Sequence, residues 1–301
     1  MSRPTLLLTG RDGQLGTVFS QQWQGCELSG RYELVEVGRR ELDIADSLEV
    51  KEFLADLRPT YILNTAAYTR VDEAESDQES AYRVNDNAVG LLADWCKDNL
   101  CRLLHISTDF VFDGDATSPY SEDSETVPLN VYGASKLAGE VQVTSCLPSS
   151  GIVVRTSWLY SEHGQNFVKT MLRLMSERRD VRVVRDQIGS PTSAHTLSRY
   201  IAQLIAADSA AGIHHFTDGG ELSWFEFAVA IREIGVELGL IPARATVTPV
   251  TAAEYPTAAR RPPYSVLERT PKGAPDCGAT PSWRAELYSV LERIKAGPSG
   301  P

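Results

Sequence analysis

The sequence predicts an α/β fold in which a doubly wound parallel sheet is followed by a smaller C-terminal α/β lobe. Short apolar runs alternate with segments of helical periodicity through the first half of the chain. These runs are apolar throughout, which is typical of parallel strands covered by helices on both faces. The alternation of strand-like and helix-like segments becomes less regular after about residue 158. Residues 1–157 are therefore expected to form the main domain and residues 158–301 mainly the second lobe, with about 188–216 returning to the first.

Short apolar runs predict the strands, and apolar residues that recur every three to four positions predict the helices. The expected strands are Thr5–Thr9, Tyr32–Val37, Tyr61–Asn64, Arg102–Ile106, Ile152–Arg155, Val181–Val184 and His214–Phe216. The expected helices are Gln14–Gln22, Leu48–Leu57, Ser80–Asn99, Val131–Cys146, Phe167–Glu177, His195–Ala207 and Trp224–Leu238. The segment 255–275 is rich in Pro, Arg and Ala and is expected to be an ordered loop over a site or a mobile flap. The tail 297–301 is expected to be disordered.

The bulk composition argues against several classes of function. The 301 residues carry a formal net charge of −11 and no basic stripe, which argues against nonspecific binding of nucleic acid. The apolar run Leu6–Leu8 is too short for a signal peptide or a membrane span, so no membrane partner is expected. The five cysteines are scattered and form no CxxC pair, so neither a disulfide framework nor a zinc site is expected. These features favour a soluble cytoplasmic protein, either a monomer or a homodimer.

A glycine-rich loop, Gly10-Arg-Asp-Gly-Gln-Leu-Gly16, follows the first strand. Its glycines permit a tight turn, a close approach of pyrophosphate to the backbone and close packing of the next helix, whose free N–H groups favour an anion. Glycine spacing alone is weak evidence, and a tight turn without a ligand is the alternative. The position between a strand and a helix favours a dinucleotide-binding (Rossmann) loop. The cofactor contacts expected in this loop are Gly10, Asp12, Gly13, Gln14, Leu15 and Gly16.

The second strand ends at Val37-Gly-Arg-Arg40, where an acidic residue would bind the ribose of NAD and an arginine would accommodate the 2′-phosphate of NADP. Arg39 and Arg40 therefore favour NADPH, with NADH as the alternative cofactor and a solvated basic turn as the alternative role. Asp43 and Ile44 are expected to flank the adenine.

Tyr132 and Lys136 lie four residues apart, early in an expected helix, and so share one helix face. A nearby ammonium and a positively charged nicotinamide are expected to lower the pKa of the phenol, so that it can exchange a proton with a sugar alcohol or ketone near neutral pH. A surface Tyr and Lys would be the ordinary alternative. The position after a dinucleotide loop and after a strand that ends in Ser107-Thr108-Asp109 favours a site, with Thr108 holding the ketone oxygen beside the phenol.

At this point the chain resembles the extended short-chain dehydrogenase/reductases, and most closely the dTDP-4-dehydrorhamnose reductase family. The resemblance covers almost the whole chain. It is carried by Gly10–Gly16, Asn64–Asp72 with Ala74 and Glu75, Ser107–Gly114, Pro128–Gly133, Lys136–Glu140, Arg155–Tyr160, Asn166–Leu172, Asp186–Thr192, and Arg261 and Pro262 with Ser265.

The resemblance implies NAD(P)H-dependent reduction of the C4 ketone of a dTDP-4-dehydro-6-deoxy sugar, most closely dTDP-4-dehydro-L-rhamnose to dTDP-L-rhamnose. It implies Thr108, Tyr132 and Lys136 as the catalytic set, and further cofactor contacts at Ala66, Ala67 and Tyr68. The implied substrate contacts are Val71, Thr108, Asp109, Trp158, Asn166, Gln187 and Arg261. Four of these have ordinary alternatives: a core aromatic for Trp158, a helix cap for Asn166, a turn amide for Gln187 and a solvated charge for Arg261.

The chain departs from the family at Pro263-Tyr264, where the family usually has Asn directly before the serine that is here Ser265. This departure concerns local substrate contacts and leaves the hydride chemistry untouched. Some members bind Mg²⁺ through glutamates at a dimer interface. Neither the histidines nor the carboxylates of this chain are spaced as an independent metal site, so no metal ligand is assigned.

The same scaffold supports three alternative activities. A sugar-nucleotide 4,6-dehydratase would need an Asp-Glu pair after the threonine, whereas Asp109 is followed by Phe110, so reduction is favoured over dehydration. A sugar-nucleotide epimerase stays open, because it differs mainly in how tightly it keeps its cofactor. A non-catalytic NADP-binding regulatory subunit, of the type found with methionine adenosyltransferase, also stays open, although the intact Thr, Tyr and Lys set speaks against it.

Overall fold

The computed structural model describes residues 3–269 and 281–297, and its main domain is built on a parallel sheet of six strands. The strand order is β10-β5-β4-β3-β1-β2, and every neighbouring pair is parallel. The doubly wound α/β fold predicted from the sequence is confirmed. The strands are β1 (Thr5–Thr9), β2 (Glu33–Val37), β3 (Tyr61–Asn64), β4 (Arg102–Thr108), β5 (Gly151–Thr156) and β10 (Gly212–His215).

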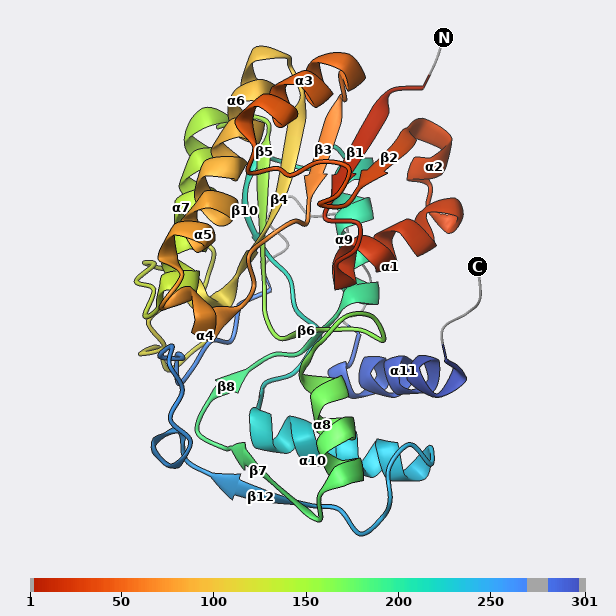
Figure 1. Ribbon diagram of the computed structural model, residues 1–301, viewed down its shortest axis with the longest axis vertical. Helices are drawn as coiled ribbons and strands as arrows, with labels where there is room; N and C mark the ends of the chain where they lie inside the picture. The colour runs from red at the N-terminus through yellow and green to blue at the C-terminus, as the bar shows by residue number, and fades with distance from the viewer. Residues whose placement is uncertain (1–2, 270–280, 298–301) are drawn as a thin grey trace.

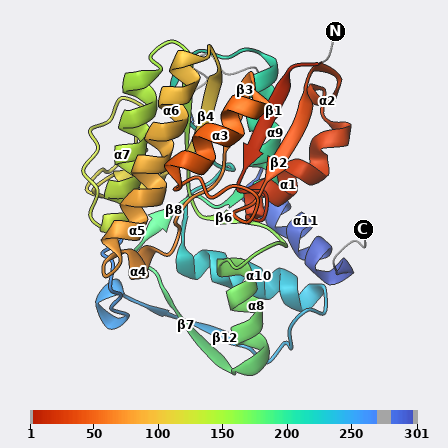
Figure 2. The same cartoon turned by 45° about the horizontal axis from the view of Figure 1, so that its top comes forward.

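Helices cover both faces of this sheet, which explains why its central strands are mainly apolar. Leu6 and Leu8 of β1 pack in one cluster with α1 (Gln14–Gln22) and α9 (Ala194–Ala206). Leu7 points to the opposite face, because successive side chains of a strand alternate. There it packs in a second cluster with α3, α6 and α7. Figures 1 and 2 show these helices on either side of the sheet. Their bounds are Ser47–Leu57 for α3, Ala88–Asp98 for α6 and Val131–Cys146 for α7.

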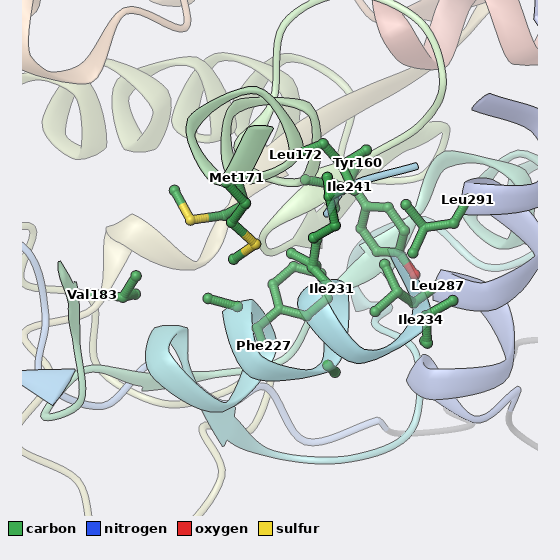
Figure 3. Close-up of a cluster of buried hydrophobic side chains, with 14 of the residues drawn as sticks. Tyr160, Met171, Leu172, Val183, Phe227, Ile231, Ile234, Ile241, Leu287 and Leu291 are labelled. Atoms are coloured by element: carbon green, nitrogen blue, oxygen red, sulfur yellow. The ribbon is translucent and has the colours of Figure 1, made fainter. Parts of the chain in front are cut away.

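The second lobe lies beyond the carboxyl ends of the strands and has its own core (Figure 1). Met171 of α8, Phe227 of α10 and Leu287 of α11 are buried together with their neighbours (Figure 3). The parallel pair β7 and β12 borders this lobe. The core of the lobe therefore joins segments that lie more than a hundred residues apart in sequence. The elements are α8 (Phe167–Glu177), β7 (Asp180–Val184), α10 (Trp224–Glu237), β12 (Thr246–Val250) and α11 (Trp283–Ala296).

The remaining elements are short. They are η1 (Trp23–Gly25), α2 (Leu28–Arg31), α4 (Val71–Ala74), α5 (Gln78–Tyr82), η2 (Arg83–Asn87), η3 (Asp109–Val111), β6 (Leu159–Tyr160), β8 (Ile188–Gly189), β9 (Thr192–Ser193), β11 (Leu222–Ser223) and η4 (Ala252–Glu254). The expected flap 255–275 is described only to residue 269. That part is held by bridges from Tyr264 to Ile188 and from Leu267 to Tyr120. The expected disordered tail falls, from residue 298 on, outside the described residues.

One predicted helix is interrupted. The stretch expected as a single helix over 80–99 consists of α5, a π-helical turn η2 and α6. The turn directs the buried side chain of Asn85 towards Tyr68, accepting from its backbone N–H at 2.9 Å and donating to its carbonyl at 3.0 Å. Such turns are common at functional sites. Of the described helices, none is long and apolar enough to cross a membrane.

Candidate functional site

A cavity of about 830 Å³ lies at the carboxyl ends of the strands, where the strand order reverses between β1 and β3. In open α/β sheets this switch point is where ligands bind. Apart from Arg40, its lining includes every residue predicted to contact the cofactor. These are Gly10, Asp12, Gly13, Gln14, Leu15, Gly16, Arg39, Asp43, Ile44, Ala66, Ala67, Tyr68, Tyr132 and Lys136.

The glycine loop at this cavity tolerates no side chain at two of its positions. Gly10 has a φ of +79°, and a Cβ there would stand 2.6 Å from the backbone nitrogen of Ala66. A Cβ on Gly16 would overlap the carbonyl oxygen of Gly10. The loop therefore presents bare backbone ahead of α1, which is the cradle that a dinucleotide pyrophosphate requires.

The basic turn after β2 lies at one edge of the same cavity. Arg39 lines it, and its guanidinium lies 3.4 Å from the Asp43 carboxylate while its side chain stays 75% exposed. The guanidinium of Arg11 is instead paired with another residue, since it donates to the Glu41 carboxylate at 3.0 Å. Arg39 is therefore an exposed cation at the edge of the cavity, where it can meet a phosphate with little desolvation. Arg40, its neighbour, is exposed and is not among the residues lining the cavity.

Tyr132 is held beside Thr108 by the way α7 begins. Asn130 caps the helix by accepting from the N–H of Gly133 at 2.8 Å and donates to the carbonyl of Arg260 at 2.8 Å. A Cβ on Gly133 would overlap the carbonyl oxygen of Phe110, so the helix lies directly against the turn that follows Thr108. The sequence thus brings Thr108, Tyr132 and Lys136 into one cavity.

The electrostatics of Tyr132 and Lys136 run opposite to the sequence-based expectation. Burial raises the pKa of Tyr132 to about 12, helped by the Asp109 carboxylate and opposed by a hydrogen bond with Thr108. Burial also lowers the pKa of Lys136 to about 7, opposed by Glu140. The Lys136 Nζ donates to the carbonyl of Ile106 at 2.6 Å and lies 3.0 Å from His105 Nε2. The lysine is directed at β4 and is not among the groups that shift the pKa of the phenol.

Asp109 is a second buried acid at this site. It is 2% exposed, and Thr108 donates to its Oδ1 at 3.1 Å. Burial raises its pKa to about 6, against hydrogen bonds from Ser265 and Thr108 that favour the carboxylate. Of its two oxygens, Oδ2 has no hydrogen-bond partner among the described residues.

A second cavity of about 980 Å³ adjoins the first, and Trp158 lines both. Trp158 has a φ of +48°, an uncommon conformation for a bulky residue. Its ring stacks on Trp224 with centroids 3.5 Å apart, and a Cβ on Gly189 would stand 2.6 Å from it. The indole is thus fixed between the two cavities. Of the predicted substrate contacts, Trp158, Gln187 and Arg261 line the second cavity, while Thr108, Asp109 and Asn166 line the first.

The remaining predicted contacts have definite places. Asn166 caps α8 by accepting from the N–H of Lys169 at 3.0 Å, and its amide also donates to Gln14 at 2.7 Å. Arg261 makes a bidentate pair with Asp72, at 3.0 and 2.7 Å. Val71 begins α4 and is not among the described residues that line either cavity.

Several residues of the site were not singled out from the sequence. Arg182, Arg260 and Trp224 line the second cavity. Trp224 looked like one more apolar residue of an amphipathic helix, and the two arginines carried no local motif. Asn64 and His105 are fully buried polar residues inside strands. A buried polar residue in an apolar strand was the available signal, because such groups need partners.

Comparison with known proteins assigns the family. The family model described as the RmlD substrate binding domain matches residues 4–296. A dTDP-4-dehydrorhamnose reductase from Aggregatibacter actinomycetemcomitans is 39% identical, over 95% of this chain and 97% of its own length. The chain belongs to the dTDP-4-dehydrorhamnose reductase family. A further family member is a dTDP-4-keto-6-deoxy-D-glucose reductase from Streptomyces niveus, 40% identical over 97% of this chain and 98% of its own.

A solved structure agrees with this assignment to the dTDP-4-dehydrorhamnose reductase family. The enzyme of that name from Bacillus anthracis, in complex with NADP, superposes with a TM-score of 0.86. It is 36% identical and covers 97% of this chain and 99% of its own. A dTDP-glucose 4,6-dehydratase from Streptomyces venezuelae, 17% identical with a TM-score of 0.79, shares the fold.

Proposed function

We propose that the protein reduces the C4 ketone of a dTDP-4-dehydro-6-deoxy sugar with NADPH, converting dTDP-4-dehydro-L-rhamnose to dTDP-L-rhamnose. The observation that carries the proposal is the convergence of the bare glycine loop with Thr108, Tyr132 and Lys136 on one cavity. The names of the two relatives, reductases of dTDP-4-keto sugars, support the substrate class.

NADPH, when bound along the glycine loop, supplies the hydride. Tyr132 supplies the proton: with a pKa of about 12 the buried phenol is protonated at neutral pH, and the alkoxide that forms at C4 is a strong enough base to take its proton. The Thr108 hydroxyl positions the ketone oxygen beside the phenol, and Lys136 binds the nicotinamide ribose. Thr108 and Lys136 are buried and Tyr132 is partly buried, which limits access of water and strengthens their polar contacts.

The second cavity fits the sugar nucleotide. Arg182, Arg260 and Arg261 are among its lining residues, and arginines suit a diphosphate. The indole of Trp158, fixed on Trp224, offers a flat apolar face to the sugar where the two cavities adjoin. The pairing of Arg261 with Asp72 leaves Arg182 and Arg260 as the stronger candidates for the phosphates.

NADPH is preferred over NADH in this proposal because Arg39 stands where the 2′-phosphate would lie. Within 3–269 and 281–297, no cluster of three or more His, Cys, Asp or Glu side chains is arranged to hold a metal ion, so no step is assigned to one.

The test is incubation of the purified protein with excess NADPH and dTDP-4-dehydro-L-rhamnose. Stoichiometric oxidation of NADPH, with dTDP-L-rhamnose identified by NMR, is the expected result. An epimerase would leave NADPH unoxidised while changing the sugar, and a regulatory subunit would bind NADP without turnover. Either result would contradict the proposal. Running the same assay with NADH measures the cofactor preference.

A further inference from the structure

A side-chain hydrogen bond joins the glycine loop of the main domain to the start of α8 in the second lobe. Asn166 Nδ2 donates to Gln14 Oε1 at 2.7 Å, across 152 positions of sequence. Gln14 is the first residue of α1 and lines the first cavity, while Asn166 is the N-cap of α8 (Figure 1). Phe167 and Met171 of α8 line the second cavity. The bond therefore connects the cradle expected for the dinucleotide with the helix at the other cavity.

The neighbouring groups fix the orientation of both amides. The N–H of Lys169 can only donate, and it donates to Asn166 Oδ1 at 3.0 Å, so that oxygen faces α8. Nδ2 faces the carbonyl oxygens of Ser161 at 2.8 Å and His163 at 3.3 Å, which can only accept. Gln14 must therefore present its oxygen to Asn166. The N–H groups of the Asn166 amide are thus used within the protein.

The segment 161–166 packs directly on the Gln14 side chain. A Cβ on Gly164 would stand 3.0 Å from Gln14 Cγ, and the Ser161 hydroxyl donates to Gln14 Oε1 at 3.3 Å. Ser161 is fully buried. A pyrophosphate bound by the free N–H groups at the start of α1 would fix the backbone of Gln14, and with it the base of this side chain.

We infer that Gln14 is a positioning residue, which transmits dinucleotide binding to the second lobe by holding the cap of α8 in place. The inference rests on the proposed function in placing the dinucleotide at the glycine loop and the sugar nucleotide in the second cavity. Its consequence is cooperative binding. Each ligand raises the affinity of the other, and by the same factor, because linkage is reciprocal.

Other contacts hold the same segment without reaching the cap of α8, and they supply a matched control. His163 Nε2 lies 3.1 Å from Gln21 Oε1, and the Glu162 carboxylate lies 2.9 Å from His195 Nε2. Gln21 lies about two turns after Gln14 in α1 and is not among the residues lining either cavity. It is the same residue type, on the same helix, bonded to the same segment.

The first test is hydrogen exchange of the backbone amides with and without NADP⁺. In the wild type we expect NADP⁺ to slow exchange both in the glycine loop and in α8. Gln14→Met keeps the length of the side chain and removes its amide, so protection of the glycine loop should remain while that of α8 is lost. Gln21→Met should keep both. Equal protection of α8 in Gln14→Met and the wild type, or no protection of α8 in the wild type, would overturn the inference.

Asn166→Ser breaks the same bond from the other side. Serine caps a helix about as well as asparagine, so α8 stays capped, but its side chain is too short to reach Gln14. We expect the same loss of α8 protection as in Gln14→Met. Protection of α8 as in the wild type would contradict the role given to this bond.

The second test measures the cooperativity by calorimetric titration with dTDP, with and without NADP⁺. We expect NADP⁺ to tighten dTDP binding about tenfold in the wild type and in Gln21→Met, and less than about twofold in Gln14→Met. Equal factors in Gln14→Met and the wild type would overturn the inference and leave the proposed reductase intact. A protein that bound no dTDP would lose the proposed substrate class, while the exchange data would still decide the inference.

Discussion

Gly133 lies so close to the carbonyl oxygen of Phe110 that a Cβ would overlap that oxygen. The contact fixes the first turn of α7 against the turn after β4, and with it the distance between Tyr132 and Thr108. The absence of a side chain at Gly133 is thus a condition for the arrangement of the proposed catalytic groups.

Gly133→Ala is expected to push the start of α7 away from Phe110 and to lower kcat about a hundredfold, since misplacement by about 1 Å has an effect of that size. NADPH binding should change little, because the glycine loop is untouched. Ala134→Gly is the control: it costs about 1 kcal/mol of helix propensity without moving the phenol. Steady-state kinetics and thermal unfolding of both variants give the answer, and equal loss of kcat in both would refute the argument.

Arg39→Ala is expected to raise the KM for NADPH about tenfold and to leave the KM for NADH unchanged, since one charge-assisted hydrogen bond to the 2′-phosphate is lost. Arg40→Ala is the neighbouring control, because Arg40 is not among the residues lining the cavity. Kinetics with both cofactors decide the matter. A parallel rise for NADH and NADPH would show that Arg39 does not read the phosphate.

Asp72→Asn is expected to raise the KM for the sugar nucleotide by up to about fivefold, since a half-exposed ion pair contributes modestly. The pair ties α4 to the loop over the second cavity. The hydrogen bond from Arg261 lowers the pKa of Asp72, so the pair persists above the ordinary carboxyl pKa and is lost only as the pH falls through the lowered value. The KM of the wild type should therefore show no step from Asp72 near neutral pH. An unchanged KM in Asp72→Asn would mean that the tie does not shape the substrate site.

Asp109 makes the stability of the fold depend on pH in the sense opposite to that of the Asp72 pair. Its folded pKa of about 6 lies above the unfolded value of about 4, so the folded protein loses stability as the pH rises between the two. The loss is on the order of 3 kcal/mol at most. Denaturant unfolding at several pH values should show this slope in the wild type and in the exposed control Asp115→Asn. Asp109→Asn should lack it; an identical slope in that variant would assign the effect to another group.

Most of the fold followed from the sequence, because the central strands and the amphipathic helices carry their pattern locally. Thr5–Thr9, Tyr61–Asn64 and Val131–Cys146 have the predicted bounds. The π-helical turn at 83–87 was not predictable from periodicity, since the contact that accompanies it, between Asn85 and Tyr68, joins residues distant in sequence. Strand β12 carries Pro249 and exposed polar residues, and α11 has a weak apolar stripe, so neither gave a strong signal.

The candidate site, like the fold, was predictable from the sequence only in part. The residues in motifs, such as Gly10 and Tyr132, converge on one cavity as the motifs indicate. The direction of the Lys136 side chain was beyond sequence reasoning, because it depends on His105 and Ile106 of another element. For the same reason Lys136 is not among the groups that shift the Tyr132 pKa.

The central claim is that Tyr132 delivers the proton while hydride reaches C4 of the sugar. The most direct measurement is single-turnover reduction of dTDP-4-dehydro-L-rhamnose with NADPH deuterated at nicotinamide C4, in the wild type and in Tyr132→Phe. We expect deuterium at C4 of the dTDP-L-rhamnose product in the wild type. In Tyr132→Phe we expect a rate at least about a hundredfold lower, with NADPH still bound. Deuterium transfer at an undiminished rate in Tyr132→Phe would contradict the account.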